Sequence, residues 1–341
     1  MAEADPVIGI LMSSGPGAVI TACAGLGGVR FVPILEPDDF GTHAGMLDAL
    51  IVSNDFYTDD VARWVASDTR LRWLQSSSTG HEHLDERGAP RHLAVTEPGP
   101  VYSDIVAEHA VALLLALARG VLPMERLRQR RCWDRESVVP GMVALKDRTL
   151  LAIGFGRIGQ ETARRVRPFG MRVLAVVRRP PSPEAAALAE EFVHGDGLDG
   201  ALARADAVLL GVPLTTETKH MIGARELRLM KRSAYLVNMA RGPVLDEHAL
   251  AEALAAGQIA GAALDVFDEE PLPASSPLWG FENVIISPHL SAFGDDHGGR
   301  AFGAVARENV RRFLAGEVLL NPIPGYRDRP IRPVRVAAGD C

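Results

Sequence analysis

Short apolar runs alternate with longer mixed stretches along most of this chain, and that alternation is typical of α/β proteins. In the first hundred residues the apolar runs lie at 7–12, 29–35, 50–52, 71–75 and 93–96. A second series lies at 149–153, 172–177, 207–211, 234–238, 262–266 and 284–287. Because strands that are separated by helices pair in parallel, we expect two α/β domains, the second with a sheet of about six strands.

Two predicted helices indicate where the domains divide. The helix at 103–119 begins at a Ser-Asp cap and is apolar on nearly every face, which indicates that it is buried. The amphipathic stretch 300–314 is expected to form a helix that returns to the first domain. We therefore place one discontinuous domain at 1–100 plus 293–341, with a second domain, 101–292, inserted into it.

The strand at 149–153 runs directly into a G-x-G-x-x-G pattern. Gly154 permits a tight turn, Gly156 lets the backbone approach a pyrophosphate, and Gly159 lets the next helix pack against its strand. Apolar positions at helical spacing follow, so the pattern opens a helix whose N–H groups and positive dipole end suit phosphate. We therefore predict a dinucleotide site, with a purely structural glycine turn as the alternative.

The end of the strand at 172–177 bears on which dinucleotide binds. An NAD site usually has Asp or Glu there, which accepts hydrogen bonds from the ribose 2′-hydroxyl. Here Val177 is followed by Arg178 and Arg179. Two guanidinium groups suit a 2′-phosphate, which a carboxylate would repel. We predict a preference for NADP(H); in the alternative, both arginines face solvent and NAD(H) is also used.

Composition limits the possible partners. The chain has 341 residues and a net charge of −7, so a nucleic-acid partner is not expected. Its three cysteines, Cys23, Cys132 and Cys341, lie far apart, so we expect neither a disulfide framework nor a metal site. No signal-peptide pattern precedes the first strand, and the apolar stretch 106–118 is too short to span a bilayer. We expect a cytoplasmic protein without a membrane partner.

Three polar side chains follow successive strands of the second domain, where ligands bind in such sheets. Arg241 brings a guanidinium, Glu270 a carboxylate and His289 an imidazole. Reduction of a 2-oxo acid needs an acid for the forming alkoxide, a carboxylate that orients this acid, and a planar cation for the substrate carboxylate. Taken singly, these residues could instead be a surface arginine, a solvated acid and a core histidine.

The layout of residues 45–323 resembles the D-isomer-specific 2-hydroxyacid dehydrogenase family. Besides the glycine pattern, the resemblance rests on Pro213-Leu214-Thr215 with Glu217-Thr218, Asn238-Met239-Ala240-Arg241-Gly242, Leu264-Asp265-Val266-Phe267 with Glu270-Pro271-Leu272, Pro288-His289, and Val106-Ala107-Glu108-His109. It implies an α/β fold of two Rossmann-like domains. The discontinuous domain would be a flavodoxin-like substrate-binding lid, and the inserted domain would bind NAD(P).

The resemblance also implies roles for individual residues. Arg241 would bind the substrate's carboxylate and ketone, His289 would be the acid/base, and Glu270 would pair with His289. Asp265 would contact the nicotinamide carboxamide. Further cofactor-binding positions would be Arg157, Ile158, Val212, Pro213, Thr218 and Ala240.

A substrate-binding loop of the first domain is implied in the same way. Backbone N–H groups of Gly80 and His81 would bind the substrate carboxylate, and Asn54 aligns with a second substrate-side loop. His81 departs from the family pattern, where a small apolar residue is common. Its ring could contact an unusual substrate or point into solvent beside Glu82 and His83.

The segment 128–139 resembles a dimerising arm of that family, which implies a homodimer. Trp133 suits an interface, because tryptophan is an efficient anchor there, and a local core role is the alternative. The four arginines of this segment are interpreted first as a solvated face and otherwise as attracting anionic substrates.

Together these features predict NADPH-dependent reduction of a small 2-oxo acid to the D-2-hydroxy acid, with glyoxylate or hydroxypyruvate favoured by the resemblance. Pyruvate-like, phenylpyruvate-like and phosphonate-bearing acids stay open. Two alternatives remain: a phosphite-type or other small-acid dehydrogenase, and a nucleotide-sensing, co-repressor-like binding protein.

Overall fold

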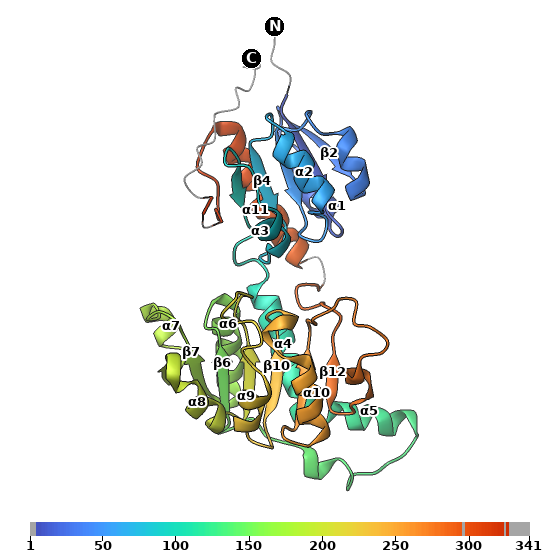
Figure 1. The fold of residues 1–341 in the computed structure, drawn as a ribbon, viewed down its shortest axis with the longest axis vertical. Coiled ribbons are helices and arrows are strands. Elements are labelled where there is room, and N and C mark those ends of the chain that lie inside the picture. Colours follow the sequence, from blue (N-terminus) through green and yellow to red (C-terminus); the bar gives the residue numbers. More distant parts are fainter. Residues whose placement is uncertain (1–4, 295–296, 324, 327–341) are drawn as a thin grey trace. The chain divides into compact units, whose positions relative to one another are not determined.

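The computed structural model describes residues 5–294, 297–323 and 325–326. The chain divides into two compact units, Met1–Val101 with Gly294–Cys341, and Tyr102–Phe293 (Figure 1). Each unit is built on its own parallel sheet, so the predicted fold class is confirmed. Residues 1–4 and 327–341, which we expected in the first domain and which include Cys341, lie outside the described residues.

The first unit is a five-stranded sheet in the order β2-β1-β3-β4-β5, which is the flavodoxin-like order. Its strands are β1 (Val7–Leu11), β2 (Arg30–Ile34), β3 (Ala49–Val52), β4 (Trp73–Ser76) and β5 (Ala94–Thr96). All neighbours pair in parallel. Four of these strands are buried along their whole length, which explains why they read as continuous apolar runs.

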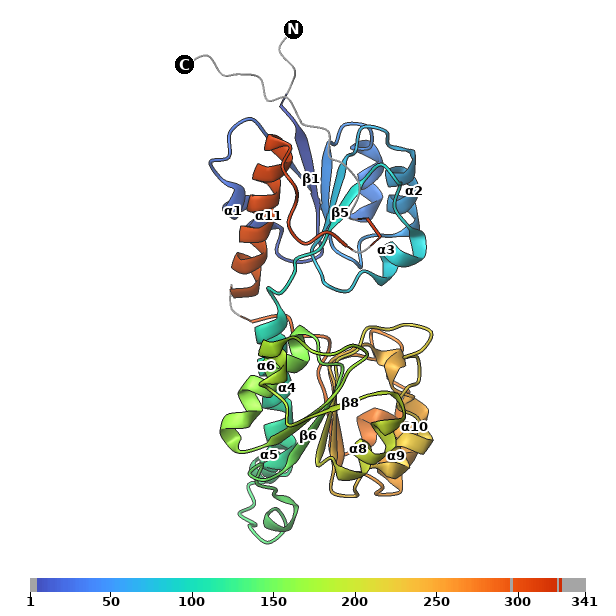
Figure 2. The ribbon, with the colours of Figure 1, turned by 90° about the vertical axis from the view of Figure 1, so that its left-hand side faces the viewer.

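Helices cover both faces of this sheet: α1 (Pro16–Cys23), α2 (Asp59–Ser67), α3 (Glu82–Arg87) and α11 (His297–Ala315), with a 3-10 turn at Pro37–Thr42. The expected helix at 300–314 is therefore present as α11. It packs beside α1 (Figure 2), and the approach is close because a Cβ on Gly303 would lie 2.9 Å from the Cβ of Ala22. Buried Asn309 of α11 also donates to the Gln75 side chain at 2.8 Å, which fixes the helix on the sheet.

The second unit holds a seven-stranded parallel sheet in the order β12-β11-β10-β9-β6-β7-β8. Its strands are β6 (Thr149–Ile153), β7 (Arg172–Val176), β8 (Glu191–Val193), β9 (Ala207–Leu210), β10 (Tyr235–Asn238), β11 (Gly261–Leu264) and β12 (Val284–Ile286). If β6 is numbered 1 and the sheet is read from its β8 edge, the strand order begins 3-2-1-4-5-6, as in dinucleotide-binding folds. We expected about six strands and missed β8, because three edge residues beginning with an exposed glutamate carry no recognisable period.

Helices also cover both faces of the second sheet: α4 (Ser103–Ala118), α5 (Val121–Gln129), α6 (Arg157–Val166), α7 (Pro183–Ala186), α8 (Leu198–Arg204), α9 (Ala224–Leu229) and α10 (Glu247–Ala255). Figure 2 shows α4 and α6 on one face and α8, α9 and α10 on the other. Short 3-10 turns lie at Val139–Gly141, Arg167–Phe169, Gly195–Gly197, Gly242–Val244 and Pro277–Gly280. The apolar helix expected at 103–119 is α4, and it packs on α6, β10 and β11.

In the described part of the chain, no single helix is long and apolar enough to cross a membrane, and α4 with α5 passes that test only as a pair bent by 65°. The same residues contain no cluster of three His, Cys, Asp or Glu side chains that could hold a metal ion. Cys23 is a buried free thiol and Cys132 an exposed one.

Candidate active site

His289 and Glu270 form an ion pair at one edge of the second sheet. Nδ1 of His289 lies 2.7 Å from Oε2 of Glu270. The other carboxylate oxygen, Oε1, accepts the backbone N–H of Phe267 at 2.9 Å. Glu270 follows β11 and His289 follows β12, and these strands are neighbours, so residues 19 positions apart in sequence meet. Since Nδ1 is engaged with the carboxylate, Nε2 is the ring nitrogen left to exchange a proton with a substrate.

The pair shifts both pKa values toward the charged forms. The hydrogen bond to Glu270 raises the pKa of His289, and this outweighs partial burial and the nearby positive charge of Arg241. Burial by itself raises the pKa of Glu270, but the hydrogen bonds from His289 and Phe267 outweigh burial and leave that pKa below its ordinary value. Both shifts favour an imidazolium held by a carboxylate over the neutral forms of the two groups.

Arg241 lies in the loop after β10, the next strand in the same sheet. The loop is held by Asn238, whose Oδ1 accepts the N–H of Ala240 at 3.0 Å and whose Nδ2 donates to the carbonyl of Arg241 at 3.3 Å. Arg241 is half-buried, and its charge acts on both His289 and Glu270. The structure thus brings together the guanidinium, carboxylate and imidazole that the sequence placed after successive strands. We had assigned no role to Asn238, although it stands in the quoted motif.

Gly242 explains how this loop fits against its neighbour. A Cβ at Gly242 would lie 1.9 Å from the carbonyl carbon of Phe267, so only glycine allows the two backbones to pass. Phe267 is the residue whose N–H holds Glu270. The glycine therefore sets the spacing between the Arg241 loop and the Glu270 loop.

A cleft of about 630 Å³ opens where the glycine pattern predicts a dinucleotide site. Its lining includes Gly154, Gly156, Arg178, Arg179, Gly211, Val212, Pro213, Thr215, Glu217 and Thr218. Gly154 has φ 96°, and a Cβ there would lie 2.6 Å from the carbonyl carbon of Gly211. A Cβ on Gly159 would lie 2.4 Å from the carbonyl oxygen of Gly154, so both glycines are required by backbone crowding.

The remaining predicted cofactor positions, Arg157, Ile158, Ala240 and Asp265, are not among the residues that line this cleft. Arg157 and Ile158 begin α6, directly after Gly156. Ala240 and Asp265 follow β10 and β11, and they are 4% and 1% exposed. Asp265 accepts hydrogen bonds from the Ser287 hydroxyl and from the N–H groups of Leu290 and Ser291, so most of its acceptor capacity is already used. Its contact with a nicotinamide carboxamide stays a prediction.

The expected substrate loop of the first unit is held by its own polar contacts. Asn54, after β3, accepts the N–H of His83 at 3.1 Å, and its carbonyl oxygen lies 2.9 Å from Nδ1 of that histidine. The carbonyl of Gly80 accepts from the Ser78 hydroxyl at 2.6 Å. Nδ1 of His81 lies 2.8 Å from Oδ2 of Asp85, one helical turn away. Neither alternative for this ring, contact with a substrate or exposure to solvent, included an ion pair with Asp85. The substrate-binding roles of Asn54, Gly80 and His81 stay predictions.

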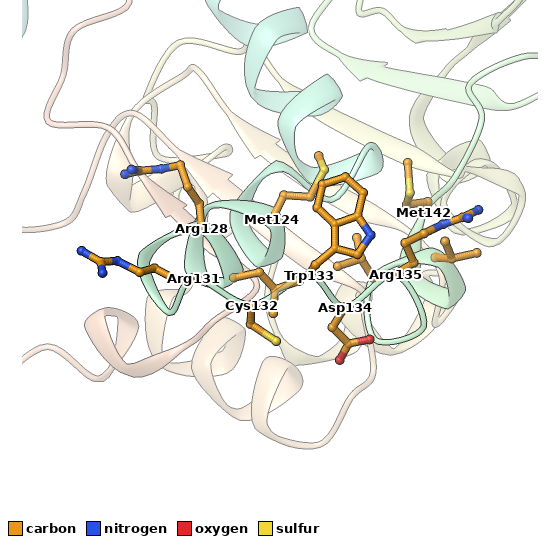
Figure 3. Close-up of a pocket in the computed structure, with 11 residues that line it drawn as sticks. Met124, Arg128, Arg131, Cys132, Trp133, Asp134, Arg135 and Met142 are labelled. Atoms are coloured by element: carbon orange, nitrogen blue, oxygen red, sulfur yellow. The ribbon is translucent and has the colours of Figure 1, made fainter.

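A second hollow, of about 600 Å³, lies beside α5 and the segment after it. Figure 3 shows the indole of Trp133 beside Met124, with Arg128 and Arg131 pointing away from it. Trp133 is 93% exposed, so the local core role that we considered for it is wrong. Such an exposed tryptophan beside other apolar side chains is typical of a surface that binds a ligand or another protein.

The comparisons with known proteins agree with this geometry. Residues 111–291, more than half of the chain, match the family model described as D-isomer specific 2-hydroxyacid dehydrogenase, NAD binding domain. A glyoxylate reductase of Thermococcus gammatolerans is 41% identical over 259 residues, which cover 73% of this chain and 75% of that protein. A D-3-phosphoglycerate dehydrogenase of Methanocaldococcus jannaschii is 36% identical over 278 residues, covering 81% of this chain and 51% of that protein.

Solved structures lead to the same family. The NADPH-dependent glyoxylate/hydroxypyruvate reductase of Sinorhizobium meliloti, in complex with citrate, is similar with a TM-score of 0.80 and 26% identity, covering 97% of this chain and 100% of that one. A D-isomer specific 2-hydroxyacid dehydrogenase of Xanthobacter autotrophicus Py2, in complex with NADPH and MES, has a TM-score of 0.75 and 28% identity, covering 95% and 99%. The chain therefore belongs to the D-isomer-specific 2-hydroxyacid dehydrogenase family and is an NAD(P)-dependent oxidoreductase.

Proposed function

We propose that this enzyme reduces a small 2-oxo acid to the D-2-hydroxy acid with NADPH, and that glyoxylate or hydroxypyruvate is the preferred kind of substrate. The observation that carries the proposal is the 2.7 Å pair of Glu270 and His289 beside Arg241. The names of the relatives, glyoxylate reductase and glyoxylate/hydroxypyruvate reductase, support the substrate class.

The roles of the three residues follow from their chemistry. A bound reduced nicotinamide supplies the hydride that goes to the ketone carbon. His289, held as an imidazolium by Glu270, gives its Nε2 proton to the ketone oxygen, so that C=O becomes CH–OH and the ring becomes neutral. The ring then takes a proton from water before the next turnover. Glu270 stays ionised and fixes the ring, since its own pKa is lowered.

Arg241 is suited to the other end of the substrate. A guanidinium can bind a planar carboxylate through two parallel hydrogen bonds, and its charge polarises the neighbouring ketone. Arg241 acts electrostatically on both members of the acid/base pair, which supports a place for the substrate's 2-oxo acid group between these three residues.

The preference for NADPH is supported by the cleft. Arg178 and Arg179 both line it, next to the strand end at which an acidic residue would bind a ribose 2′-hydroxyl. Glu217 lines the same cleft and lies near enough to Arg178 for that charge to help lower its pKa, after hydrogen bonds to Thr215 and its own backbone. The two arginines together leave a positive site for a 2′-phosphate.

We also propose a homodimer in which the surface around Trp133 is buried, supported by its exposure and by the apolar hollow beside it. A cytoplasmic location, and the expectation that nucleic acids and membranes are not partners, stay predictions from composition.

The test is a panel of initial rates of NADPH and NADH oxidation with glyoxylate, hydroxypyruvate, phenylpyruvate and phosphonopyruvate. We expect turnover of glyoxylate or hydroxypyruvate, faster with NADPH. Phosphite is assayed in the opposite direction with NAD and NADP, and phosphite oxidation without reduction of any panel member would establish the alternative dehydrogenase. Tight NADPH binding without any turnover would favour the nucleotide-sensing protein.

A further inference from the structure

A chain of hydrogen-bonded side chains in the second unit runs from α4 to the ends of β12 and β11. Nε2 of His109, in α4, lies 2.9 Å from the hydroxyl of Ser287. That hydroxyl lies 2.5 Å from Oδ1 of Asp265. Ser287 is 6% exposed and Asp265 is 1% exposed, so this contact is shielded from water. His109 is partly exposed and lies on α4 between the buried residues Ala107 and Ala110.

The direction of each hydrogen bond follows from counting protons. Asp265 accepts three: Oδ1 takes the Ser287 hydroxyl and the Leu290 N–H, and Oδ2 takes the Ser291 N–H. An ionised carboxylate only accepts, so Ser287 must donate its single proton to it. The serine oxygen must then accept from His109, which places a proton on Nε2 of that ring. With a proton on Nε2, His109 can donate this hydrogen bond whether its ring is neutral or cationic. The hydrogen bonds from His109 to Asp265 therefore do not require a charged ring.

These hydrogen bonds hold the turn that carries His289. The N–H of His289 lies 2.9 Å from both the carbonyl oxygen of Asp265 and that of Ser287. The next two N–H groups, of Leu290 and Ser291, bind the Asp265 carboxylate. His289 itself has φ 54°, in the left-handed region that residues other than glycine rarely adopt. Such a conformation persists only where its surroundings fix it, and Asp265 supplies most of that fixation.

We propose that His109 and Ser287 are positioning residues, which lock Asp265 onto the turn and so hold the His289 ring against Glu270 in the geometry for proton transfer. The inference rests on the proposed role of His289 in reduction. His109 and Ser287 lie 178 positions apart, and neither has a role in the acid/base pair itself.

The charged groups that face His289 determine how its pKa should respond to the loss of the His109 donor. Glu270 and Asp265 are negative and Arg241 is positive, and the hydrogen bond to Glu270 is the largest influence that raises the pKa of His289. If the turn relaxes, that hydrogen bond weakens first. Loss of the His109 donor should therefore lower the pKa of His289, and should reduce kcat by about tenfold or more, as for other residues that orient a ligand. The KM should change less, because Arg241 is untouched.

The experiment compares His109→Leu, which removes the donor, with His109→Gln, whose amide nitrogen can reach the place of Nε2. In the full-length protein with ¹⁵N-labelled histidine, the ring nitrogens of His109 and His289 are titrated by NMR, with assignments from the loss of signals in the His109→Gln and His289→Asn variants. We expect the wild-type His109 ring to be the Nε2–H tautomer when neutral. The pKa of His289 should fall in His109→Leu and return in His109→Gln.

Three results would overturn the proposal: an Nδ1–H tautomer at His109, a His289 pKa that is unchanged or raised in His109→Leu, or equal behaviour of the Leu and Gln variants. If His109→Leu does not fold, the same titration is made on Ser287→Ala. The proposal requires that the pKa of His289 is lower in that variant too. Binding of NADPH, followed by its fluorescence, should be retained in the His109 variants and shows that they are folded. The titration needs no substrate. An absence of turnover in the wild type would therefore contradict the proposed function, but the effect of His109 on the pKa of His289 could still be measured.

Discussion

The two units share a parallel α/β architecture but differ at the turn that follows their first strand. In the second unit Gly154 has φ 96° and a Cβ there would lie 2.6 Å from the Gly211 carbonyl carbon. In the first unit Gly15 has φ 72°, but nothing lies within 4 Å of an added Cβ. Gly15 is needed for conformation alone, whereas Gly154 is needed because two backbones meet beside a cleft.

Their polar side chains differ in the same way. His289 of the second unit pairs with Glu270 from the neighbouring strand end, 19 positions away. His81 of the first unit pairs with Asp85, one turn along its own helix. The two histidines therefore differ in how their rings are held, one by the end of a neighbouring strand and the other within its own helix. The second unit fixes its functional groups by contacts between strands, and the predictions below test whether chemistry depends on those contacts.

The largest effect is expected at the two histidines. His289→Gln removes the proton donor and should lower kcat by roughly 10²- to 10⁴-fold, while NADPH binding is kept. His81→Gln should cost far less, because the ring pairs with Asp85. Initial rates and NADPH fluorescence titrations of both variants test this difference. Comparable losses of kcat in the two variants would remove the distinction between the units.

The glycine pair should show the next largest effect. Gly154→Ala forces its loop away from Gly211 and should weaken NADPH binding by about tenfold or more, since each lost charge-assisted hydrogen bond to the phosphates is worth about 1.5–3 kcal/mol. Gly15→Ala should cost about 1–2 kcal/mol of folding free energy for the left-handed backbone and leave NADPH affinity intact. Thermal unfolding and NADPH titration separate the two. Unchanged NADPH affinity in Gly154→Ala would contradict a nucleotide site at this turn.

Two exposed tryptophans test the proposed dimer. Trp133→Ala should weaken self-association by roughly 30-fold, the equivalent of about 2 kcal/mol for an interface anchor. Trp64, on α2 of the first unit, is 46% exposed and serves as the control, since Trp64→Ala should leave association unchanged. Sedimentation velocity over a range of concentrations measures both. A wild-type protein that is monomeric throughout would refute the dimer.

Arginines on the two units distinguish cofactor recognition from structural pairing. Changing Arg178 and Arg179 to Ala should raise the KM for NADPH by about tenfold or more relative to that for NADH, since each lost charge-assisted hydrogen bond is worth about 1.5–3 kcal/mol. Arg70 of the first unit pairs with Asp48, so Arg70→Ala should affect stability and neither KM. Equal increases for NADPH and NADH would exclude a 2′-phosphate site at Arg178 and Arg179.

The smallest effect is a shift in pH dependence. Reduction requires protonated His289, whose pKa is raised chiefly by Glu270, so kcat/KM for reduction should fall as the pH rises through that pKa. Oxidation of the hydroxy acid requires the neutral ring and should show the opposite trend. Glu270→Gln should move the decline for reduction to lower pH, whereas Asp85→Asn should leave it in place. A profile that Glu270→Gln does not alter would show that another group limits the rate.

Much of the fold and site could be predicted because parallel strands obey simple rules. Adjacent strand ends meet at one edge of a parallel sheet, so the sequence alone predicts that Arg241, Glu270 and His289 lie together. The glycine pattern predicted the cleft because each glycine answers a local backbone constraint. These predictions required only neighbouring residues and strand order.

Features that depend on distant contacts could not be predicted. The link from His109 to Ser287 joins residues 178 positions apart and has no local pattern. β8 was missed because its three residues become a strand only by pairing with β7.

The most direct test of the central claim follows the hydride itself. The best panel substrate that gives a chiral product is reduced with NADPH that carries deuterium at the transferable C4 position. We expect a D-2-hydroxy acid with one deuterium on C2, and loss of this product in His289→Gln. An L-hydroxy acid, or a D-hydroxy acid whose C2 hydrogen comes from water, would contradict the account.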